Sequence, residues 1–182
     1  MKNPFKAPIT QAWTLFLDRD GVINERPMND YVRTRDGFHF LPGAIKAIHI
    51  LSSIFSRVIL VTNQQGVAKG LMQEKDLEQV HAYMLKEINR ADGRIDKIYC
   101  CTQLASEKGN CRKPGITMAN QAKLDFPEID FRKSIMVGDT ESDILFGKNA
   151  GMFTVLISGT EQNHQADACY DSLLAFAKSI AP

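Results

Sequence analysis

The sequence has little cysteine, a single tryptophan, almost no net charge and no long hydrophobic run. With 22 basic and 21 acidic residues the formal net charge is +1, so no long-range field is available to hold a polyanion. Nucleic acid is therefore disfavoured as a partner. Residues 1–11 lack the apolar core of a secretion signal, and no later stretch approaches the length of a membrane span. We expect a cytoplasmic protein with no membrane partner.

The four cysteines are too few and too unevenly spaced for a disulfide framework. They are Cys100, Cys101, Cys111 and Cys169. A reducing compartment is expected to keep all of them as thiols.

The length and the pattern of apolar residues predict one α/β domain over residues 1–182. A chain of this size fills about one hydrophobic core. Apolar runs of strand length alternate with segments of helical period, which is typical of a parallel sheet covered by helices. The predicted strands are Trp13–Leu17, Arg57–Val61, Ile95–Cys101, Ser134–Val137 and Phe153–Ile157. The predicted helices are centred on residues 45–55, 77–88, 116–124, 142–150 and 172–180, the fourth ending at Gly151. The expected fold is a three-layer, Rossmann-like sheet with helices on both faces.

Polar side chains follow three of these strands where each strand ends. They are Asp18, Thr62 and Asp139. In open parallel sheets the carboxyl edge of the strands is where ligands bind. We therefore expect these residues to share one site.

Asp18 and Asp20 stand two residues apart after the first strand, in the run Leu17-Asp18-Arg19-Asp20-Gly21. An acidic turn before glycine explains such a pair equally well when it is taken alone. A carboxylate can also attack phosphorus to form an acyl phosphate, and a second one can pass a proton to the leaving group. A divalent cation relieves the repulsion between the two.

Two further segments supply groups that bind an anion. Thr62-Asn63-Gln64 follows a buried strand with a hydroxyl and backbone amides, although a hydrogen-bonded turn would look the same. Arg112 and Lys113 precede a proline; such a pair is often simply solvated, but an ammonium and a guanidinium fork also suit a phosphoryl group.

Asp139 completes the set of acidic residues. Asp143 lies four residues later, where helix capping is a sufficient explanation for it but not for Asp139. Magnesium sites commonly use one or two carboxylates together with phosphate and water, so Asp18 and Asp139 form an adequate pair.

In this order and at strand ends, the four segments resemble the motifs of the haloacid dehalogenase superfamily, over about Trp13–Ile157. The resemblance implies a nucleophile at Asp18 and an acid/base at Asp20, whose backbone carbonyl also reaches Mg2+. It further implies a phosphate donor at Thr62, a catalytic lysine at Lys113 and a metal ligand at Asp139.

The chain looks like one subgroup in particular, the heptose-bisphosphate and histidinol-phosphate phosphatases, which have short loops in place of a large cap domain. In that subgroup the positions of Arg112, Asn63 and Gln64 are taken to bind substrate. The sequence departs from the subgroup at Thr140, where the heptose enzymes carry a lysine. It also departs in the zinc loop: Cys101 and Cys111 match ligand positions, but Gln103 and Gly109 do not.

The resemblance implies a Mg2+-dependent phosphatase for a small phosphorylated metabolite, with D-glycero-D-manno-heptose 1,7-bisphosphate as first choice. Histidinol phosphate, other sugar or glycerol phosphates, and nucleic-acid 3′-phosphate ends remain alternatives. A non-catalytic binding module on the same fold is a further one, which the presence of both Asp18 and Asp20 disfavours. We expect a monomer without structural zinc, because a closed zinc site needs about four Cys or His ligands.

Overall fold

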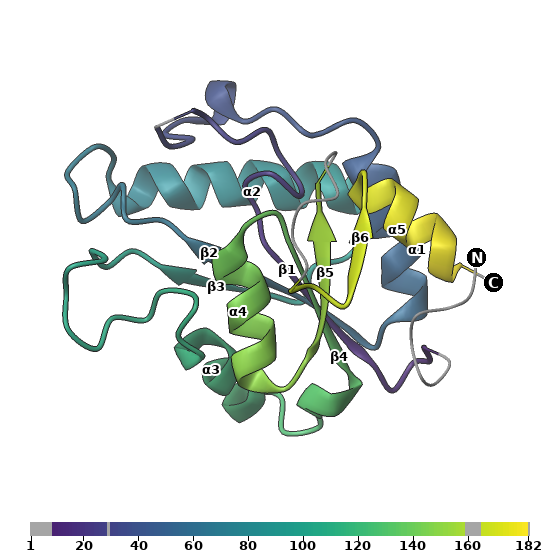
Figure 1. Ribbon diagram of the computed structural model, residues 1–182. Coiled ribbons are helices and arrows are strands. Elements are labelled where there is room, and N and C mark those ends of the chain that lie inside the picture. Colours follow the sequence, from purple (N-terminus) through teal and green to yellow (C-terminus); the bar gives the residue numbers. More distant parts are fainter. Residues whose placement is uncertain (1–8, 29, 159–164, 182) are drawn as a thin grey trace.

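The computed structural model describes residues 9–28, 30–158 and 165–181, and every structural statement below refers to these residues. They form one parallel sheet in the order β3-β2-β1-β4-β5-β6 (Figure 1). The strands are β1 Thr14–Leu17, β2 Arg57–Asn63, β3 Lys97–Cys101, β4 Ser134–Gly138, β5 Phe153–Ile157 and β6 Ala168–Tyr170.

Helices cover both faces of this sheet (Figure 1). One face carries α1 Ala44–Ile54, α2 Glu74–Arg90 and α5 Leu173–Ile180, and the other carries α3 Thr117–Asp125 and α4 Glu141–Ala150. Short 3-10 turns occupy Arg35–Gly37 and Phe131–Lys133. The predicted three-layer α/β fold is confirmed.

The core follows from the alternation of side chains along each strand. In β1, Leu15 and Leu17 point into the cluster beneath α1, α2 and α5, whereas Phe16 points into the cluster beneath α3 and α4. All three are fully buried. This two-sided burial explains why the central strands read as continuous apolar runs.

The strand order places the candidate residues together. β1 pairs with β2 on one side and with β4 on the other, with Leu17 opposite both Leu60 and Val137. From β1 the strands are added towards one edge of the sheet as β2 and β3, and from β4 they are added towards the other edge as β5 and β6. The strand order therefore reverses between β1 and β4, and the crevice beyond the carboxyl ends of these two strands is the usual ligand site of such sheets.

Several elements differ from the sequence prediction. β1 begins at Thr14 and β3 at Lys97, and β4 continues to Gly138. β6 is a sixth strand that was not predicted, because it is only three residues long and half-exposed at the sheet edge. α2 begins at Glu74, three residues before the first apolar position, since Gln73 and Asp76 form a capping box there. β2 continues to Asn63.

In the described part of the chain, no helix combines the length and apolar character that crossing a membrane requires. The absence of a secretion signal rests partly on residues 1–8, which lie outside the described residues. The single-domain assignment of residues 1–182 stays a prediction.

Candidate active site

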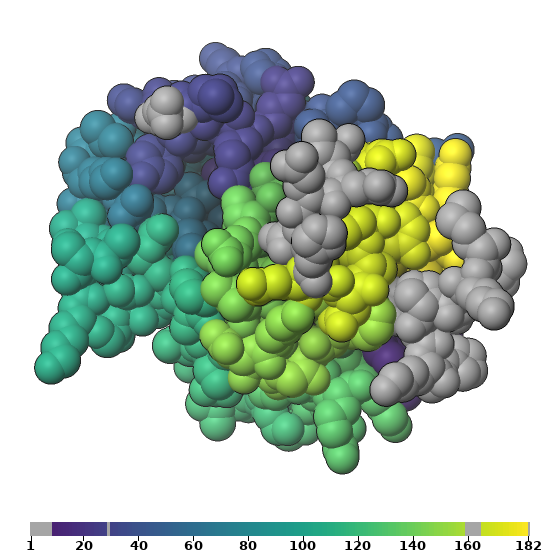
Figure 2. Space-filling model, in the orientation of Figure 1, coloured from purple at the N-terminus to yellow at the C-terminus, as the bar shows by residue number. Residues whose placement is uncertain are grey.

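A cavity of about 750 Å³ lies at the carboxyl ends of β1 and β2 and beside the start of α4. In the space-filling view, the purple-blue segment after β1, the teal loops and the green start of α4 meet around a hollow on this face (Figure 2). The residues that were predicted as site residues and line the cavity are Asp18, Asp20, Thr62, Asn63, Arg112 and Lys113. The lining does not include Gln64 or Asp139.

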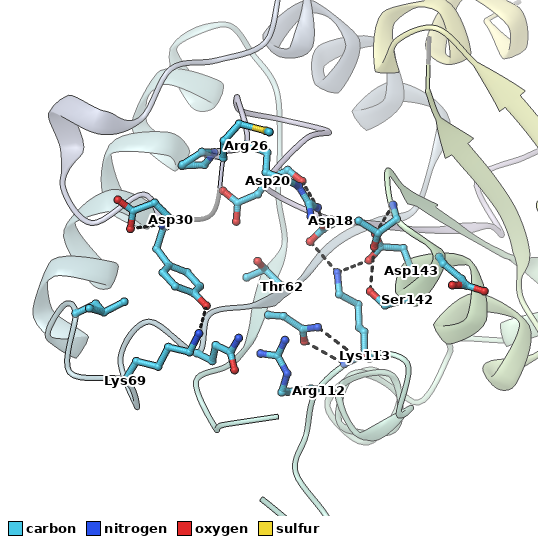
Figure 3. Close-up of a pocket in the computed structure, with 18 residues that line it drawn as sticks. Asp18, Asp20, Arg26, Asp30, Thr62, Lys69, Arg112, Lys113, Ser142 and Asp143 are labelled. Atoms are coloured by element: carbon cyan, nitrogen blue, oxygen red, sulfur yellow. Dashed lines mark hydrogen bonds and ion pairs between the residues drawn. The ribbon is translucent and has the colours of Figure 1, made fainter. Parts of the chain in front are cut away.

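Asp18 forms the centre of a buried charge cluster (Figure 3). The ammonium of Lys113 lies 2.7 Å from Oδ1 of Asp18 and 2.6 Å from Oδ1 of Asp143, and it donates to the carbonyl of Val61 at 2.8 Å. All three charged side chains are at most 7% exposed. One cation thus holds two carboxylates in a nearly dry site.

Burial sets the electrostatics of this cluster. It raises the pKa of Asp18 above the usual range of an aspartate, Asp143 adds to the rise, and Lys113 opposes it. Burial acts to lower the pKa of Lys113, but the two carboxylates outweigh it and the pKa is raised. Lys113 is therefore firmly charged.

Asp20 has the opposite surroundings. Arg19 donates to it from Nε (3.3 Å) and from Nη2 (3.0 Å to each oxygen), and Asn24 Nδ2 donates at 2.9 Å. Although burial acts to raise it, the pKa of Asp20 is lowered by Arg19 and by these hydrogen bonds. Arg19 is fully buried, and its Nη1 lies 3.1 Å from Nε2 of His81. Burial lowers the pKa of His81 to about 4, so its neutral ring can accept this bond.

Gln64 is placed behind the cavity instead of in it. It is fully buried, and its Nε2 donates to Oδ2 of Asp20 at 2.7 Å and to Oγ1 of Thr62 at 3.0 Å. The substrate-lining role predicted for Gln64 therefore does not fit its position, because full burial and these two hydrogen bonds keep its side chain out of the cavity. Its side chain orients Asp20 and Thr62.

Asp139 follows β4 and lies beside Asp18. One oxygen from each of Asp18, Asp139 and Asp143 lies within 4.8 Å of the others, which is a set of ligands suited to a divalent cation. Burial, followed by Asp143, raises the pKa of Asp139 to about 6, although Arg26 opposes the rise. Nη2 of Arg26 lies 2.6 Å from Oδ1 of Asp139, 2.9 Å from the carbonyl of Asp20 and 3.6 Å from Oδ2 of Asp18. A positive group thus sits against the predicted metal ligands.

Two glycines permit this crowding of carboxylates. Gly21 has φ +87°, and a Cβ on it would lie 1.9 Å from Oδ2 of Asp139. A Cβ on Gly138 would lie 2.1 Å from Cβ of Asp143. A side chain at either position would push a carboxylate out of the cluster.

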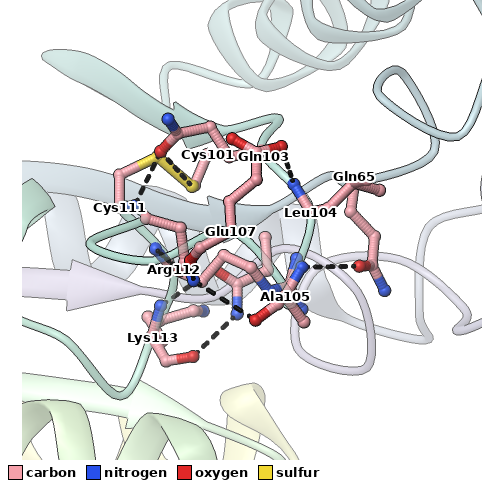
Figure 4. The surroundings of a disulfide bond; sticks show 11 residues. Gln65, Cys101, Gln103, Leu104, Ala105, Glu107, Cys111, Arg112 and Lys113 are labelled. Atoms are coloured by element: carbon pink, nitrogen blue, oxygen red, sulfur yellow. Dashed lines mark hydrogen bonds between the residues drawn. A yellow bond between two sulfur atoms is a disulfide. The ribbon is translucent and has the colours of Figure 1, made fainter.

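The segment that carries Arg112 and Lys113 is tied to its neighbours by hydrogen bonds and a disulfide (Figure 4). Asn63 Oδ1 accepts from the backbone N–H of Lys113 at 3.0 Å, and its Nδ2 donates to the Lys113 carbonyl at 3.2 Å. Gln103 Oε1 accepts from the N–H of Cys111 at 2.8 Å. These bonds fix the backbone that aims Lys113 at Asp18.

The expectation that all four cysteines are thiols is wrong for two of them. Cys101 and Cys111 form a disulfide, with their Cα atoms 5.5 Å apart. Cys101 ends β3, and the ten-residue return of the chain brings Cys111 back beside it, within the distance that such a bond requires. Cys100 and Cys169 carry thiols.

Sequence reasoning missed two residues of this site. Asp143 caps α4 as expected, accepting from the N–H of Thr140 at 3.1 Å, but its other oxygen holds Lys113. Its spacing of one helical turn from Asp139 was the available signal. For Arg26 the sequence carries no such signal, because the residue lies in an irregular segment whose position depends on contacts distant in sequence.

Comparison with known proteins places this geometry in a family. The HAD-hydrolase-like family model matches residues 110–176. The D-glycero-alpha-D-manno-heptose-1,7-bisphosphate 7-phosphatase of Mycobacterium tuberculosis strain H37Rv is 36% identical over 92% of this chain and 91% of its own. The corresponding Campylobacter jejuni enzyme is 38% identical over 81% of this chain and 83% of its own.

Solved structures of heptose-bisphosphate phosphatases are similar to this chain as well. The D,D-heptose 1,7-bisphosphate phosphatase of B. bronchiseptica, in complex with magnesium and phosphate, superposes with a TM-score of 0.82 at 26% identity. The match covers 92% of this chain and 97% of that one. The Burkholderia thailandensis enzyme of the same name has a TM-score of 0.65 at 27% identity, over 92% and 97% of the two chains. The chain therefore belongs to the haloacid dehalogenase superfamily, in the family of the heptose-1,7-bisphosphate 7-phosphatases, and is a phosphomonoester hydrolase.

Proposed function

We propose that this chain removes the 7-phosphate from D-glycero-D-manno-heptose 1,7-bisphosphate through a covalent phospho-aspartate at Asp18. The observation that carries the proposal is the carboxylate of Asp18, held 2.7 Å from Lys113 on the wall of a cavity that also contains Asp20. The heptose substrate is supported by relatives that match nearly the whole chain.

In the first half-reaction an oxygen of Asp18 attacks phosphorus, and the bond from phosphorus to the sugar oxygen breaks. Lys113 and the hydroxyl of Thr62 bind oxygens of the moving phosphoryl group, where negative charge concentrates. Asp20, in its protonated form, gives its proton to the departing sugar oxygen. The products of this step are the sugar monophosphate and an acyl phosphate on Asp18.

In the second half-reaction water attacks the acyl phosphate. Asp20 takes the proton of that water, and the bond from Asp18 to phosphorus breaks to release inorganic phosphate. Both carboxylates return to their starting forms. The same two residues of β1's carboxyl end thus serve both steps.

Arg112 is proposed to bind the remainder of the substrate. Its Nη1 is buried with no hydrogen-bond partner among the described residues, and the side chain lines the cavity. Burial lowers the pKa of Arg112, so a negative substrate group would relieve an unfavourable environment. Asn63, which lines the cavity too, is proposed to contact the same substrate.

Mg2+ is the proposed cofactor, and the donors fit it. Asp18, Asp139 and the backbone carbonyl of Asp20 offer hard oxygen atoms, the type that magnesium prefers, and Nη2 of Arg26 lies against the same three oxygens. A bound Mg2+ would neutralise charge on the phosphate and the carboxylates. Asp143 adds a carboxylate oxygen within 4.8 Å of the others.

The remaining expectations stay proposals: a single domain, a monomer, a cytoplasmic location, no nucleic-acid partner and no structural zinc. The last is supported by the disulfide, because two sulfur atoms bonded to each other do not offer the thiolates that zinc requires.

The test is phosphate release from both anomers of heptose 1,7-bisphosphate, from histidinol phosphate and from a 3′-phosphorylated oligonucleotide, each with and without Mg2+. Relatives of similar identity are named for each anomer, so both are needed. We expect the highest kcat/KM for a heptose bisphosphate, and only with Mg2+. A higher kcat/KM for histidinol phosphate or the oligonucleotide would refute the substrate.

A further inference from the structure

Arg26 is partly exposed, yet its guanidinium contacts three active-site residues. Arg26 lies in the segment after β1. Its Nη2 contacts oxygens of Asp20, which follows β1, and of Asp139, which follows β4. The distances are 2.9 Å to the carbonyl of Asp20, 2.6 Å to Oδ1 of Asp139 and 3.6 Å to Oδ2 of Asp18. Figure 3 shows Arg26 with Asp18 and Asp20 at the same side of the cavity.

The three oxygens are the ones proposed to ligate Mg2+. A guanidinium nitrogen at 2.6–2.9 Å fills the space between them, so the metal and Nη2 cannot use these oxygens at the same time. Within the described residues, the hydrogen bonds and ion pairs of Arg26 go only to this group.

The side chain of Arg26 is also partly exposed. It is 43% exposed, whereas Asp18 and Asp139 are 7% and 17% exposed, and it lines the cavity. Asp18 follows β1 and is held by Lys113, and Asp139 follows β4, whereas Arg26 lies in an irregular segment. Exchange therefore requires only a rotation of one long side chain.

We propose that Arg26 is a built-in competitor of the metal: its guanidinium binds the metal ligands, and Mg2+ binds only as that guanidinium leaves them. The displaced charge moves into the cavity, where the phosphorylated substrate binds. This inference rests on the proposed Mg2+ site. Metal affinity is then set partly by Arg26, because the apparent Kd rises as the fraction of chains with free ligands falls.

The competition has a second consequence for stability. Arg26 neutralises part of the charge of Asp18 and Asp139, which share a cluster with Asp143 in which one oxygen of each residue lies within 4.8 Å of the others. Removing the guanidinium should let these carboxylates repel each other until a divalent cation replaces it. The same substitution should therefore weaken the fold in chelator and strengthen metal binding.

The experiment is isothermal titration of the full chain with MgCl2 in the absence of substrate, with thermal melts in EDTA and in saturating Mg2+. The variants are Arg26→Met and, as a second substitution that keeps polarity, Arg26→Gln. Arg33→Met is the matched control, because Arg33 is also 43% exposed and pairs with a single carboxylate, Asp30, at 2.6 Å. Asp139→Asn reports whether binding occurs at this site.

We expect both Arg26 variants to bind Mg2+ with a Kd lower by about fivefold or more, as for a ligand freed of a competing state. Arg33→Met should match the wild type, and Asp139→Asn should lose binding. In EDTA the Tm of Arg26→Met should fall below that of Arg33→Met, and saturating Mg2+ should close the gap. Equal or weaker Mg2+ binding by the Arg26 variants, with binding still lost in Asp139→Asn, would overturn the competition alone. If Asp139→Asn binds Mg2+ as the wild type does, the metal site itself is wrong and the inference fails with it.

Discussion

Lys113→Met should destabilise the protein as well as inactivate it, because Lys113 is the cation between two buried carboxylates. The ammonium lies 2.7 Å from Asp18 and 2.6 Å from Asp143, and neither carboxylate is more than 7% exposed. Removing one partner of a buried ion pair typically costs about 3–5 kcal/mol, since the remaining charge is left uncompensated. For a chain of this length, about 1 kcal/mol shifts Tm by roughly 2–4 °C, so we expect a loss of roughly 6–20 °C.

The assay is a thermal melt in EDTA, which removes any divalent cation that could replace the lost charge. Lys69→Met is the control: Lys69 lines the same cavity but is exposed, and substitutions of exposed residues usually change stability by at most about 0.5 kcal/mol. The double variant Lys113→Met/Asp143→Asn should recover part of the stability, because it removes one of the unpaired carboxylates, but none of the activity. A Tm for Lys113→Met as high as that of Lys69→Met would show that this buried cluster is not held together by charge.

Four further outcomes are expected. Asp18→Asn should abolish turnover while leaving the fold intact, because the amide cannot form the acyl phosphate; steady-state phosphate release by a pure preparation would remove the nucleophile assignment. Asp20→Asn should slow turnover by about a hundred- to ten-thousand-fold, and less in the first step for esters with very good leaving groups; an equal effect on good and poor leaving groups would contradict the acid role. Arg112→Ala should lower kcat/KM more for heptose bisphosphate than for a small phosphate ester, whereas Lys113→Met should lower both alike; equal patterns would merge the two roles. Elemental analysis of protein purified without chelator should find far less than one zinc per chain, and a near-stoichiometric value would contradict the disulfide as well as the prediction.

The sequence was sufficient for the sheet because its central strands are buried on both faces. β1, β2 and β4 place fully buried apolar residues against two separate core clusters, and that pattern is visible as an apolar run. β6 has no such run: Ala168 and Tyr170 are half-buried and Cys169 is exposed at the sheet edge, where the strand pairs with β5. Short edge strands carry too little burial to leave a readable pattern.

The disulfide shows a different reason for error. Whether Cys101 and Cys111 bond depends on the 5.5 Å between their Cα atoms, and that distance is set by how the loop folds back against Gln65 and Asn63. The sequence predicted only a reducing compartment, and in such a compartment cysteines are expected to be thiols. A tertiary contact therefore overrode a compositional argument.

The residues of the candidate site likewise fall into those that the sequence could predict and those that it could not. Asp18, Thr62 and Asp139 could be found because each lies at the carboxyl end of a strand, and parallel strands bring these ends together. Gln64 follows a strand end too, but full burial turns it towards Asp20 and away from the cavity. Arg26 could not be found, because no periodic element carries it. What the sequence predicts well is the position of a residue along a strand, not the direction of its side chain in a loop.

The two carboxylates that follow β1 show why this distinction matters for mechanism. Asp18, the proposed nucleophile, lies among carboxylates in a buried site that favours its neutral form, whereas Asp20, the proposed acid, lies among donors that favour its charged form. A nucleophile must be charged and an acid must hold a proton, so the protein surroundings of each residue alone oppose its role. A divalent cation beside Asp18 would favour its carboxylate, and the phosphate of a bound substrate beside Asp20 would favour a shared proton. Asp18 and Asp20 therefore take the protonation states that the reaction requires only when metal and substrate are bound, because these supply charges that the chain itself does not.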